Sequence, residues 1–501
     1  MVHRVALLNL SFYENIFSSL KHHLAHRYIS TPRTLSVEAK LGMSKYNITN
    51  ALMERIHHFA SFPQTGVSLQ QMIHFGQHPT PGTILKASQF LAEELPIRLS
   101  HRVVELDGLP DGLNKMHSIQ KVKEWYAQSF EELVSFPKPR FRDLALISES
   151  RKPFPSATPN PSLDPLMQEG PSGGTPLPSS RPQGQVIRTL NGTSLTTHKT
   201  PPASQGHHNL AKGHPNRYRP PIERRHYSPP SAAVEYPPEV LDYNEKFTKM
   251  LENIKKRHDP TVTAVAQGVL EWKKKQKGGR IGAPIQEFLD RFYMSRIGIR
   301  FLIGQHVALN TLQPHPDYVG IICTKANVHD ICHEAIENAR YVCEEHFGLF
   351  SGPPIQLLCP QDLHFPYVPG HLSHICFELL KNSLRAVVER YGADNEDKFP
   401  PIKVVVVEGS EDITIKISDE GGGIARSAIP MIWTYLYTTM SDEGLETNIE
   451  QSDFNAPMAG FGYGLPLSRL YARFFGGDLR LISMDGYGTD VYISLNKLSS
   501  S

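Results

Sequence analysis

Apolar residues recur at helical spacing through most of the first 310 residues. Positions three and four apart share one face of a helix, so such a stripe predicts a helix with one buried side. The stripes cover 56–62, 67–75, 81–95 and 117–136, and later 243–256, 260–275 and 283–309. Together these segments predict an antiparallel helical bundle.

Residues at the ends of these stripes suggest where individual helices begin and stop. Thr83, or Pro81 just before it, is placed to begin the third helix, and Pro96 is placed to end or kink it, because proline lacks the N–H that a helix interior needs. Ser118 is placed to cap the fourth helix through its hydroxyl.

The pattern changes after Pro314, where short runs rich in β-branched residues alternate with helical stripes. The expected strands are 318–323, 355–358, 402–408, 412–418, 479–483 and 490–495, and the expected helices are 328–347, 371–391 and 465–475. The sequence therefore predicts an α+β protein, with an N-terminal helical bundle followed by an α/β sandwich with a mixed sheet.

Segment 152–238 interrupts the helical region and has a different composition, because it holds 18 of the 40 prolines of the chain. It has too few large apolar residues to offset the entropy of ordering it, so we expect a disordered insertion. Its basic, Pro-rich run 217–225 is more typical of a solvated linker than of a docking motif.

Composition narrows the class of protein further. A formal net charge of +2 over 501 residues does not favour nucleic-acid binding, and no apolar run approaches the roughly 20 residues that span a bilayer. The cysteine spacing resembles neither a zinc site nor a disulfide framework, so we expect free, buried thiols. These cysteines are Cys323, Cys332, Cys343, Cys359 and Cys376.

The N-terminus has two interpretations. Glu14 is the single acidic residue through Leu35, while arginines and a lysine supply positive charge, which is typical of a mitochondrial transit peptide. The alternative is an ordinary first helix over 12–25, and composition alone does not separate the two.

Three segments of the C-terminal half carry the chemistry. Within the expected helix 371–391, His374, Glu378 and Asn382 follow at steps of four and share one stripe. Asn382 offers a neutral oxygen to Mg²⁺, and Glu378 can take a proton from an attacking hydroxyl. His374 is placed to tune that carboxylate. An amphipathic surface helix would show a similar stripe, so the other two segments matter.

The second segment is Asp419 with the glycines that follow it, and the third is the glycine run that opens helix 465–475. Asp419 can accept a hydrogen bond from an exocyclic amine, and glycines let backbone approach a flat ring. Gly460, Gly462 and Gly464 precede a helix N-terminus, which favours phosphate. Thr438 and Thr439 can contact the base region, and 440–458 is positioned as a lid. Neither a dinucleotide-binding fingerprint, nor a Walker A sequence, nor a protein-kinase motif set accompanies these glycines.

The sequences FELLKNSLRA (377–386), SDEGGGIAR (418–426) and AGFGYGLPLSR (459–469) resemble the N box and the two glycine boxes of the GHKL ATP-binding superfamily. Within it, FLAEELPIRLSHR, FLDRFYMSRIGIR, YLYTTM and LSRLYARFFGGDL are similar to segments of the mitochondrial pyruvate dehydrogenase kinases. This resemblance implies a C-terminal GHKL (Bergerat) sandwich and a Mg²⁺- and ATP-dependent serine kinase that acts on the E1 α subunit of pyruvate dehydrogenase. It also implies a helical bundle that binds a lipoyl domain of E2, a homodimer, and a location in the mitochondrial matrix.

Carried over residue by residue, the resemblance implies that Glu378 is the general base with His374 beside it, that Asn382 holds Mg²⁺ and that Asp419 binds adenine. Glu378 and Asn382 are also expected to contact the nucleotide. The other expected nucleotide contacts are Arg385, Gly421, Gly423, Thr438, Thr439, Gly460, Phe461, Gly462, Tyr463, Gly464 and Leu465. Animal members of the family carry a longer tail with an Asp-Trp pair, which this sequence lacks, so the resemblance does not extend to dimer cross-over through such a tail or to lipoyl-dependent activation.

The implied organisation is a transit peptide and N-terminal extension over 1–40, a helical domain over 41–312 interrupted by 152–238, and an ATP-binding kinase domain over 313–501. Two other functions share much of this pattern. One is a kinase of the branched-chain 2-oxoacid dehydrogenase complex, and the other is a non-catalytic, nucleotide-gated adaptor for lipoyl domains. His306, in the helical region, is expected to be a packed core histidine and not a phosphate carrier.

Overall fold

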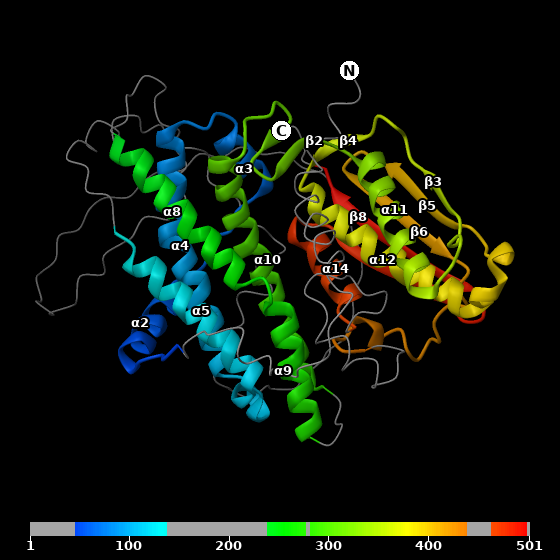
Figure 1. Ribbon diagram of the computed structural model, residues 1–501, viewed down its shortest axis with the longest axis horizontal. Helices are drawn as coiled ribbons and strands as arrows, with labels where there is room; N and C mark the ends of the chain where they lie inside the picture. Colours follow the sequence, from blue (N-terminus) through cyan, green and yellow to red (C-terminus); the bar gives the residue numbers. More distant parts are fainter. Residues whose placement is uncertain (1–45, 138–237, 277–280, 438–461, 498–501) are drawn as a thin grey trace, which may run out of the picture.

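The computed structural model describes residues 46–137, 238–276, 281–437 and 462–497. The expected transit peptide or first helix, the Pro-rich insertion with its basic run, the proposed lid, and Thr438, Thr439, Gly460 and Phe461 lie outside these ranges. Within them the chain forms two parts, a set of long helices and an α/β layer beside it (Figure 1). This is the α+β class that the sequence predicted.

The helical part is a bundle whose apolar stripes face inward. Its helices are α2 (Asn50–Ala60), α3 (Leu69–Gly76), α4 (Pro81–Asp107), α5 (His117–Ser135), α8 (Pro238–Arg257), α9 (Thr261–Lys275) and α10 (Ala283–Thr311), with a short 3-10 turn η3 (Pro110–Lys115) before α5. Helices α4 and α10 run through the middle and are buried on several sides.

The expectations that Pro96 ends its helix and that Ser118 caps the next helix are wrong. Helix α4 begins at Pro81 as expected but continues through Pro96 to Asp107. The residues beyond Pro96 include the fully buried Leu99 and Val103. Burying each such side chain stabilises by roughly 1.5–3 kcal/mol, which together exceeds the roughly 3 kcal/mol that an interior proline costs. Ser118 does not cap α5. Its hydroxyl donates to Glu271 Oε1 on α9 at 2.6 Å and so ties the two helices together.

The second part is an α/β sandwich. A five-stranded mixed sheet has the order β3-β5-β6-β8-β7, in which β3 and β5 are parallel and the other neighbours are antiparallel. Its strands are β3 (Ile355–Leu358), β5 (Ile402–Glu408), β6 (Asp412–Asp419), β7 (Asp478–Met484) and β8 (Gly488–Asn496). Helices α11 (Val328–Phe347), α12 (Pro369–Tyr391) and α14 (Gly464–Phe474) belong to this part, with the 3-10 turns η5 (Ala393–Lys398) and η6 (Met431–Trp433).

A small second sheet with the order β1-β2-β4 differs from the prediction. The expected strand 318–323 is two strands, β1 (Tyr318–Val319) and β2 (Ile322–Asn327), because Gly320 turns the chain with a φ of 62°. Strand β4 (His364–Tyr367) was not predicted, and it contains Pro366. It forms an edge of the sheet, where proline is tolerated.

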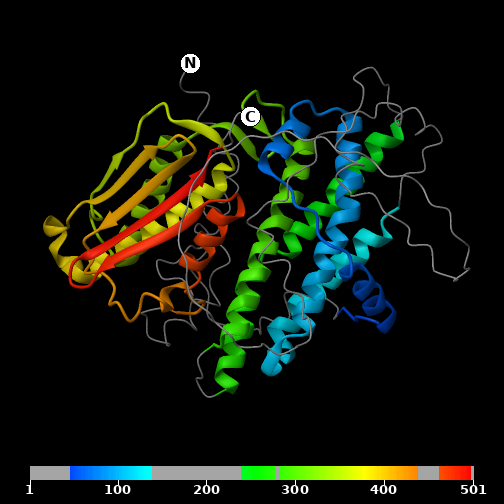
Figure 2. The ribbon, with the colours of Figure 1, turned by 180° about the vertical axis from the view of Figure 1, so that it is seen from behind.

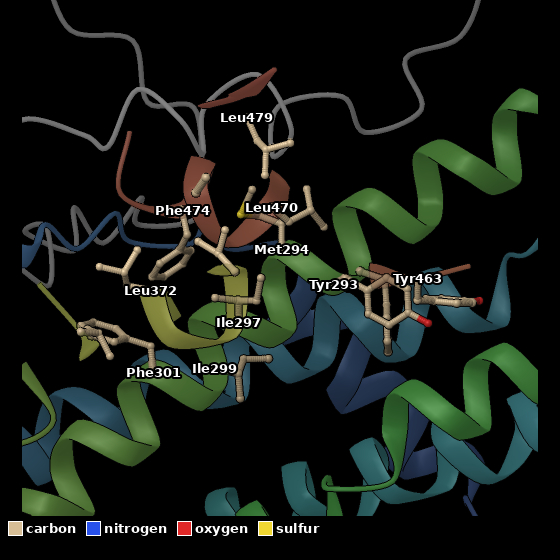
Figure 3. Close-up of a cluster of buried hydrophobic side chains, with 14 of the residues drawn as sticks. Tyr293, Met294, Ile297, Ile299, Phe301, Leu372, Tyr463, Leu470, Phe474 and Leu479 are labelled. Carbon is tan, nitrogen blue, oxygen red and sulfur yellow. The ribbon is translucent and has the colours of Figure 1, made fainter. Parts of the chain in front are cut away.

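One face of the five-stranded sheet is covered by helices, and the other carries no helix among the described residues (Figure 2). Ile482 and Met484 on β7 are 60% and 61% exposed on that open face. The helical part meets the sandwich along α10 and α14. Met294 and Ile297 of α10 pack there with Leu372 of α12 and with Leu470 and Phe474 of α14 (Figure 3). The sandwich is therefore attached to the bundle by a continuous apolar core.

Candidate nucleotide site

Helix α12 contacts both glycine segments and is the element around which the candidate site is built. Its residue Glu378 lies against Gly464, the first residue of α14. Five residues further on, Ser383 Oγ donates to Asp419 Oδ2 at 2.9 Å, and Ala386 packs against Gly421. The three sequence segments that suggested a nucleotide site are therefore brought together along one helix.

The Glu378 carboxylate lies between the start of α14 and the side chain of Lys381. A Cβ placed on Gly464 would lie 2.6 Å from Glu378 Oε2, so glycine at this position lets the oxygen approach the start of α14 without moving. The other oxygen, Oε1, forms an ion pair of 2.9 Å with Lys381 Nζ. Lys381 was missed by the sequence argument, although its position three residues after Glu378 places both side chains on the same helix face.

His374 lies one turn before Glu378 and packs edge-on against Tyr471 of α14, with ring centroids 5.0 Å apart. Burial lowers the pKa of His374, as do the charges of Lys381 and Arg296, while the Glu378 carboxylate opposes this shift. The imidazole is therefore neutral at neutral pH and contributes its packing against Tyr471 rather than charge. The step-of-four stripe of the sequence argument is confirmed by the continuous helix.

Asn382 is exposed on α12, one turn after Glu378, and its side chain has no hydrogen-bond partner among the described residues. A free amide oxygen beside a carboxylate suits Mg²⁺, which binds few protein oxygens and keeps phosphate and water ligands. No cluster of three His, Cys, Asp or Glu side chains that could hold a metal occurs within the described ranges. Arg385, three residues after Asn382 on α12, pairs with Glu389 at 2.6 Å.

Asp419 ends β6 as predicted and is 6% exposed. Its Oδ1 accepts from the Gly421 N–H at 2.9 Å, in addition to the Ser383 bond on Oδ2. Burial raises the pKa of Asp419, and these hydrogen bonds partly oppose the shift. A buried carboxylate with fixed orientation is a suitable acceptor for an exocyclic amine.

The glycines after Asp419 are required by protein contacts, which differs from the reason the sequence suggested. A Cβ on Gly421 would lie 2.4 Å from Ala386 Cβ, and one on Gly423, whose φ is 72°, would lie 2.0 Å from the Met484 carbonyl oxygen. Arg390 of α12 reinforces this packing by donating to the carbonyls of Glu420 and Gly486. The glycines therefore let the loop fit between α12 and the β7–β8 turn.

The second glycine segment is anchored by tyrosines. Gly462 has a φ of 73°, and a Cβ on it would lie 2.4 Å from the Tyr437 carbonyl oxygen. The buried Tyr463 ring packs on Tyr293 of α10 (Figure 3) and on Tyr435, with centroids 5.7 and 5.1 Å away. The Tyr463 side chain thus faces the bundle, so any nucleotide contact at this residue would come from its backbone.

Helix α14 begins at Gly464 without a side-chain cap, and Leu465, its second residue, packs partly buried against the core. The N–H groups of an uncapped first turn attract anions, and here they lie beside Glu378 and α12. The donor set, consisting of a buried Asp419, an exposed amide and an open helix N-terminus, fits a magnesium nucleotide.

Other sequence expectations concern residues away from this site. The thiols of Cys323, Cys332, Cys343 and Cys376 are free and buried, and Cys359 is free and partly buried. His306 is a packed core histidine, as predicted, since it is buried and Phe247 packs edge-on against it. Burial lowers its pKa to about 4. None of the described helices is long and apolar enough to span a bilayer.

Comparison with known proteins gives consistent matches over both parts of the chain. Residues 66–323 match the family described as mitochondrial branched-chain alpha-ketoacid dehydrogenase kinase, and residues 367–499 match histidine kinase-, DNA gyrase B- and HSP90-like ATPases. The second match contains the described part of the candidate site, from Glu378 to Leu465.

Three curated relatives are similar over most of their length. The [pyruvate dehydrogenase (acetyl-transferring)] kinase of Schizosaccharomyces pombe is 42% identical over 470 residues, which cover 90% of this chain and 97% of the relative. The kinase of the same name from Arabidopsis thaliana is 37% identical, with 90% and 95% covered. Isozyme 3 from Homo sapiens is 32% identical, with 89% and 86% covered. All three names carry the word mitochondrial.

Proposed function

This chain belongs to the mitochondrial pyruvate dehydrogenase kinase family, and from that premise we propose that it phosphorylates a serine of the E1 α subunit of pyruvate dehydrogenase and so inactivates the complex. Its GHKL-type domain is the ATP-using kinase domain. We place the protein in the mitochondrion, as the relatives' names indicate, and within it in the matrix, as the family resemblance implies.

The observation that carries this proposal is the meeting of Glu378 with the uncapped N-terminus of α14. In the proposed reaction Glu378 accepts the proton of the serine hydroxyl, and His374 holds that carboxylate in place through the packed α12–α14 contact. Phosphoryl transfer depends mainly on positioning and charge neutralisation. Bound Mg²⁺ would neutralise phosphate charge, and Asn382 is the residue that would hold it.

Asp419 is proposed to accept the adenine amine, with Gly421 and Gly423 shaping the loop around it. The backbones of Gly462, Tyr463, Gly464 and Leu465 are proposed to face the phosphates. Arg385, Thr438, Thr439, Gly460 and Phe461 remain nucleotide contacts that the family resemblance proposes.

Phosphorylation of purified E1 substrates tests this function. We expect the full chain to transfer labelled phosphate from ATP to the E1 of pyruvate dehydrogenase, and Glu378→Gln to reduce transfer by at least a hundredfold with ATP affinity nearly unchanged, because the general base contributes to the chemical step. Transfer at the wild-type rate by Glu378→Gln would show that another group is the base.

A branched-chain 2-oxoacid dehydrogenase kinase is the second candidate, because the family that matches 66–323 carries that description. The same assay with the branched-chain E1 decides between them, and faster transfer to that substrate would reverse the assignment. A non-catalytic lipoyl-domain adaptor predicts no transfer to either E1.

The helical part is proposed to bind the lipoyl domain of E2. The family resemblance supports this, and a small apolar cavity lies between α3, α4 and α10. Its lining is formed by Met72, Phe75, Ala87, Phe90, Leu91, Leu302, Gln305, His306 and Leu309. We also propose a homodimer, supported by the open face of the five-stranded sheet with its exposed Ile482 and Met484.

A further inference from the structure

Lys381 is a buried cation at the centre of the candidate site, and it has no role in the phosphoryl transfer proposed above. Its side chain is 5% exposed, and its ammonium group lies 2.9 Å from Glu378 Oε1 and 5.0 Å from the centre of the Phe377 ring. Glu378 itself is 17% exposed. A buried lysine is costly unless it is paired, so the carboxylate of Glu378 holds Lys381 in this position.

This pairing conflicts with the role proposed for Glu378. Oε1 of Glu378 already accepts from the Lys381 ammonium group, so this oxygen is not available to a serine hydroxyl while the pair persists. Oε2 of Glu378 lies beside Gly464, the first residue of α14. A helix N-terminus is also where an anion such as phosphate binds. Glu378 therefore lies beside the first residue of α14 and pairs with Lys381 at the same time.

Lys381 is well placed to change partners. The residue lies directly before Asn382 and three after Glu378 on α12, and its four-carbon side chain lets the ammonium group move without moving the helix. A phosphate at the N-terminus of α14 would sit beside Glu378 Oε2 and would carry more negative charge than the carboxylate.

We propose that Lys381 exchanges partners when ATP binds: its ammonium group leaves Glu378 Oε1 and binds the terminal phosphate, which frees Glu378 to accept the serine proton. This inference rests on the proposed kinase function. It assigns Lys381 a direct contact with the phosphate that is transferred, and it links release of the base to the presence of that phosphate. ADP, which lacks this phosphate, would leave the Lys381–Glu378 pair in place.

Binding of two nucleotides to the full chain tests the exchange without any E1 substrate. We would measure dissociation constants for ADP and for a non-hydrolysable ATP analogue, each with Mg²⁺, by calorimetry. For Lys381→Met we expect the analogue to bind about tenfold or more weakly, because a hydrogen bond to a charged group is lost. The dissociation constant for ADP should change by less than about threefold. Lys381→Arg, which keeps the charge, should restore most of the analogue affinity.

Lys123→Met is the matched control, because Lys123 is also largely buried, at 12% exposed, and paired, with Asp107, but lies in the helical bundle. It should change neither dissociation constant. Equal loss of both nucleotides in Lys381→Met, or loss of neither, would overturn the exchange, whereas a wild-type chain that binds neither nucleotide would refute the proposed function itself.

A structure of the wild-type chain with the ATP analogue and Mg²⁺ tests the same point without a substitution, should Lys381→Met unfold. We expect Lys381 Nζ within hydrogen-bond distance of a terminal phosphate oxygen and more than 4 Å from Glu378. A Lys381–Glu378 pair that persists at 2.9 Å beside the bound analogue would contradict the inference.

Discussion

At the scale of single residues, the buried carboxylate of Asp419 is expected to favour ATP binding but to lower folding stability. Burial raises the pKa of this carboxyl, so its ionised form disfavours folding. The contribution of the Asp419 carboxyl to folding stability is fully present at a pH below its unfolded pKa. It is lost as the pH rises through the folded pKa. We expect Asp419→Asn to leave stability nearly unchanged at about pH 3 and to raise it at pH 7, while ATP affinity falls about tenfold or more, because an amide nitrogen repels an adenine amine.

Thermal unfolding of Asp419→Asn and of the wild type at several pH values, with calorimetric ATP titrations, measures both effects. Ser383→Ala is the matched control, since it removes one hydrogen bond to Asp419 but keeps the carboxylate. A fall in stability that grows with pH in the Asn variant would contradict the assigned direction of the pKa shift.

The sequence predicts those residues of the candidate site that are recognisable from their spacing along the chain. Glu378 and Asn382 were found because both lie on one helix, and Asp419 because it ends a strand before glycines. Lys381 was missed because a lysine three residues from a glutamate is common on exposed helices, and sequence does not show that this one is buried. The protein contacts of Gly421 and Gly423 depend on α12 and the β7–β8 turn, which lie far away in sequence.

At the scale of elements, the loop after Asp419 and the β7–β8 turn pack closely together. Two glycines there separate the cost of a positive φ from the cost of a steric clash. Gly423 and Gly486 both have positive φ, 72° and 84°, but a Cβ on Gly423 would clash with the Met484 carbonyl and one on Gly486 would meet nothing within 4 Å. We expect Gly486→Ala to lose about 1 kcal/mol of unfolding free energy from backbone strain. Gly423→Ala should lose at least about 2 kcal/mol more.

Urea unfolding of both variants measures this difference. Equal losses would show that the loop moves away from the turn at little cost, and that the close approach is not needed for stability.

Most helices and strands could be predicted because each buries one face, which leaves a periodic pattern in sequence. The errors occurred where a distant contact decided the outcome. Helix α4 passes Pro96 because the residues after it are buried against other helices, and Ser118 bonds Glu271 instead of its own helix end. The turn at Gly320 and the edge position of β4 depend on strand pairing, which local propensity does not specify.

At the scale of the whole molecule, contact between the bundle and the sandwich could not be read from sequence. Tyr293 lies on α10, whereas Tyr435 and Tyr463 lie on either side of segment 438–461, yet their rings pack together. Tyr435 also donates to Asp290 of α10 at 2.6 Å. The backbone that leads into the candidate phosphate site is therefore fixed to the helical part, so changes in α10 can reach the site.

The open face of the five-stranded sheet gives the last prediction. Ile482 is 60% exposed there, and in the proposed dimer a second copy would cover it. A charge at this position would remain hydrated in a monomer but would be buried in the dimer. We therefore expect Ile482→Lys to keep the unfolding temperature of the monomer and to weaken dimerisation at least tenfold in analytical ultracentrifugation.

Tyr341→Lys is the control for this dimer test, because Tyr341 is 57% exposed on α11, which covers the opposite side of the sheet. It should dimerise like the wild type, since the proposed interface does not include α11. If Ile482→Lys also dimerises like the wild type, the open sheet face is not the interface. If Tyr341→Lys alone becomes monomeric, the two copies meet through the helical side of the sandwich, and the exposed residues of β7 require another explanation.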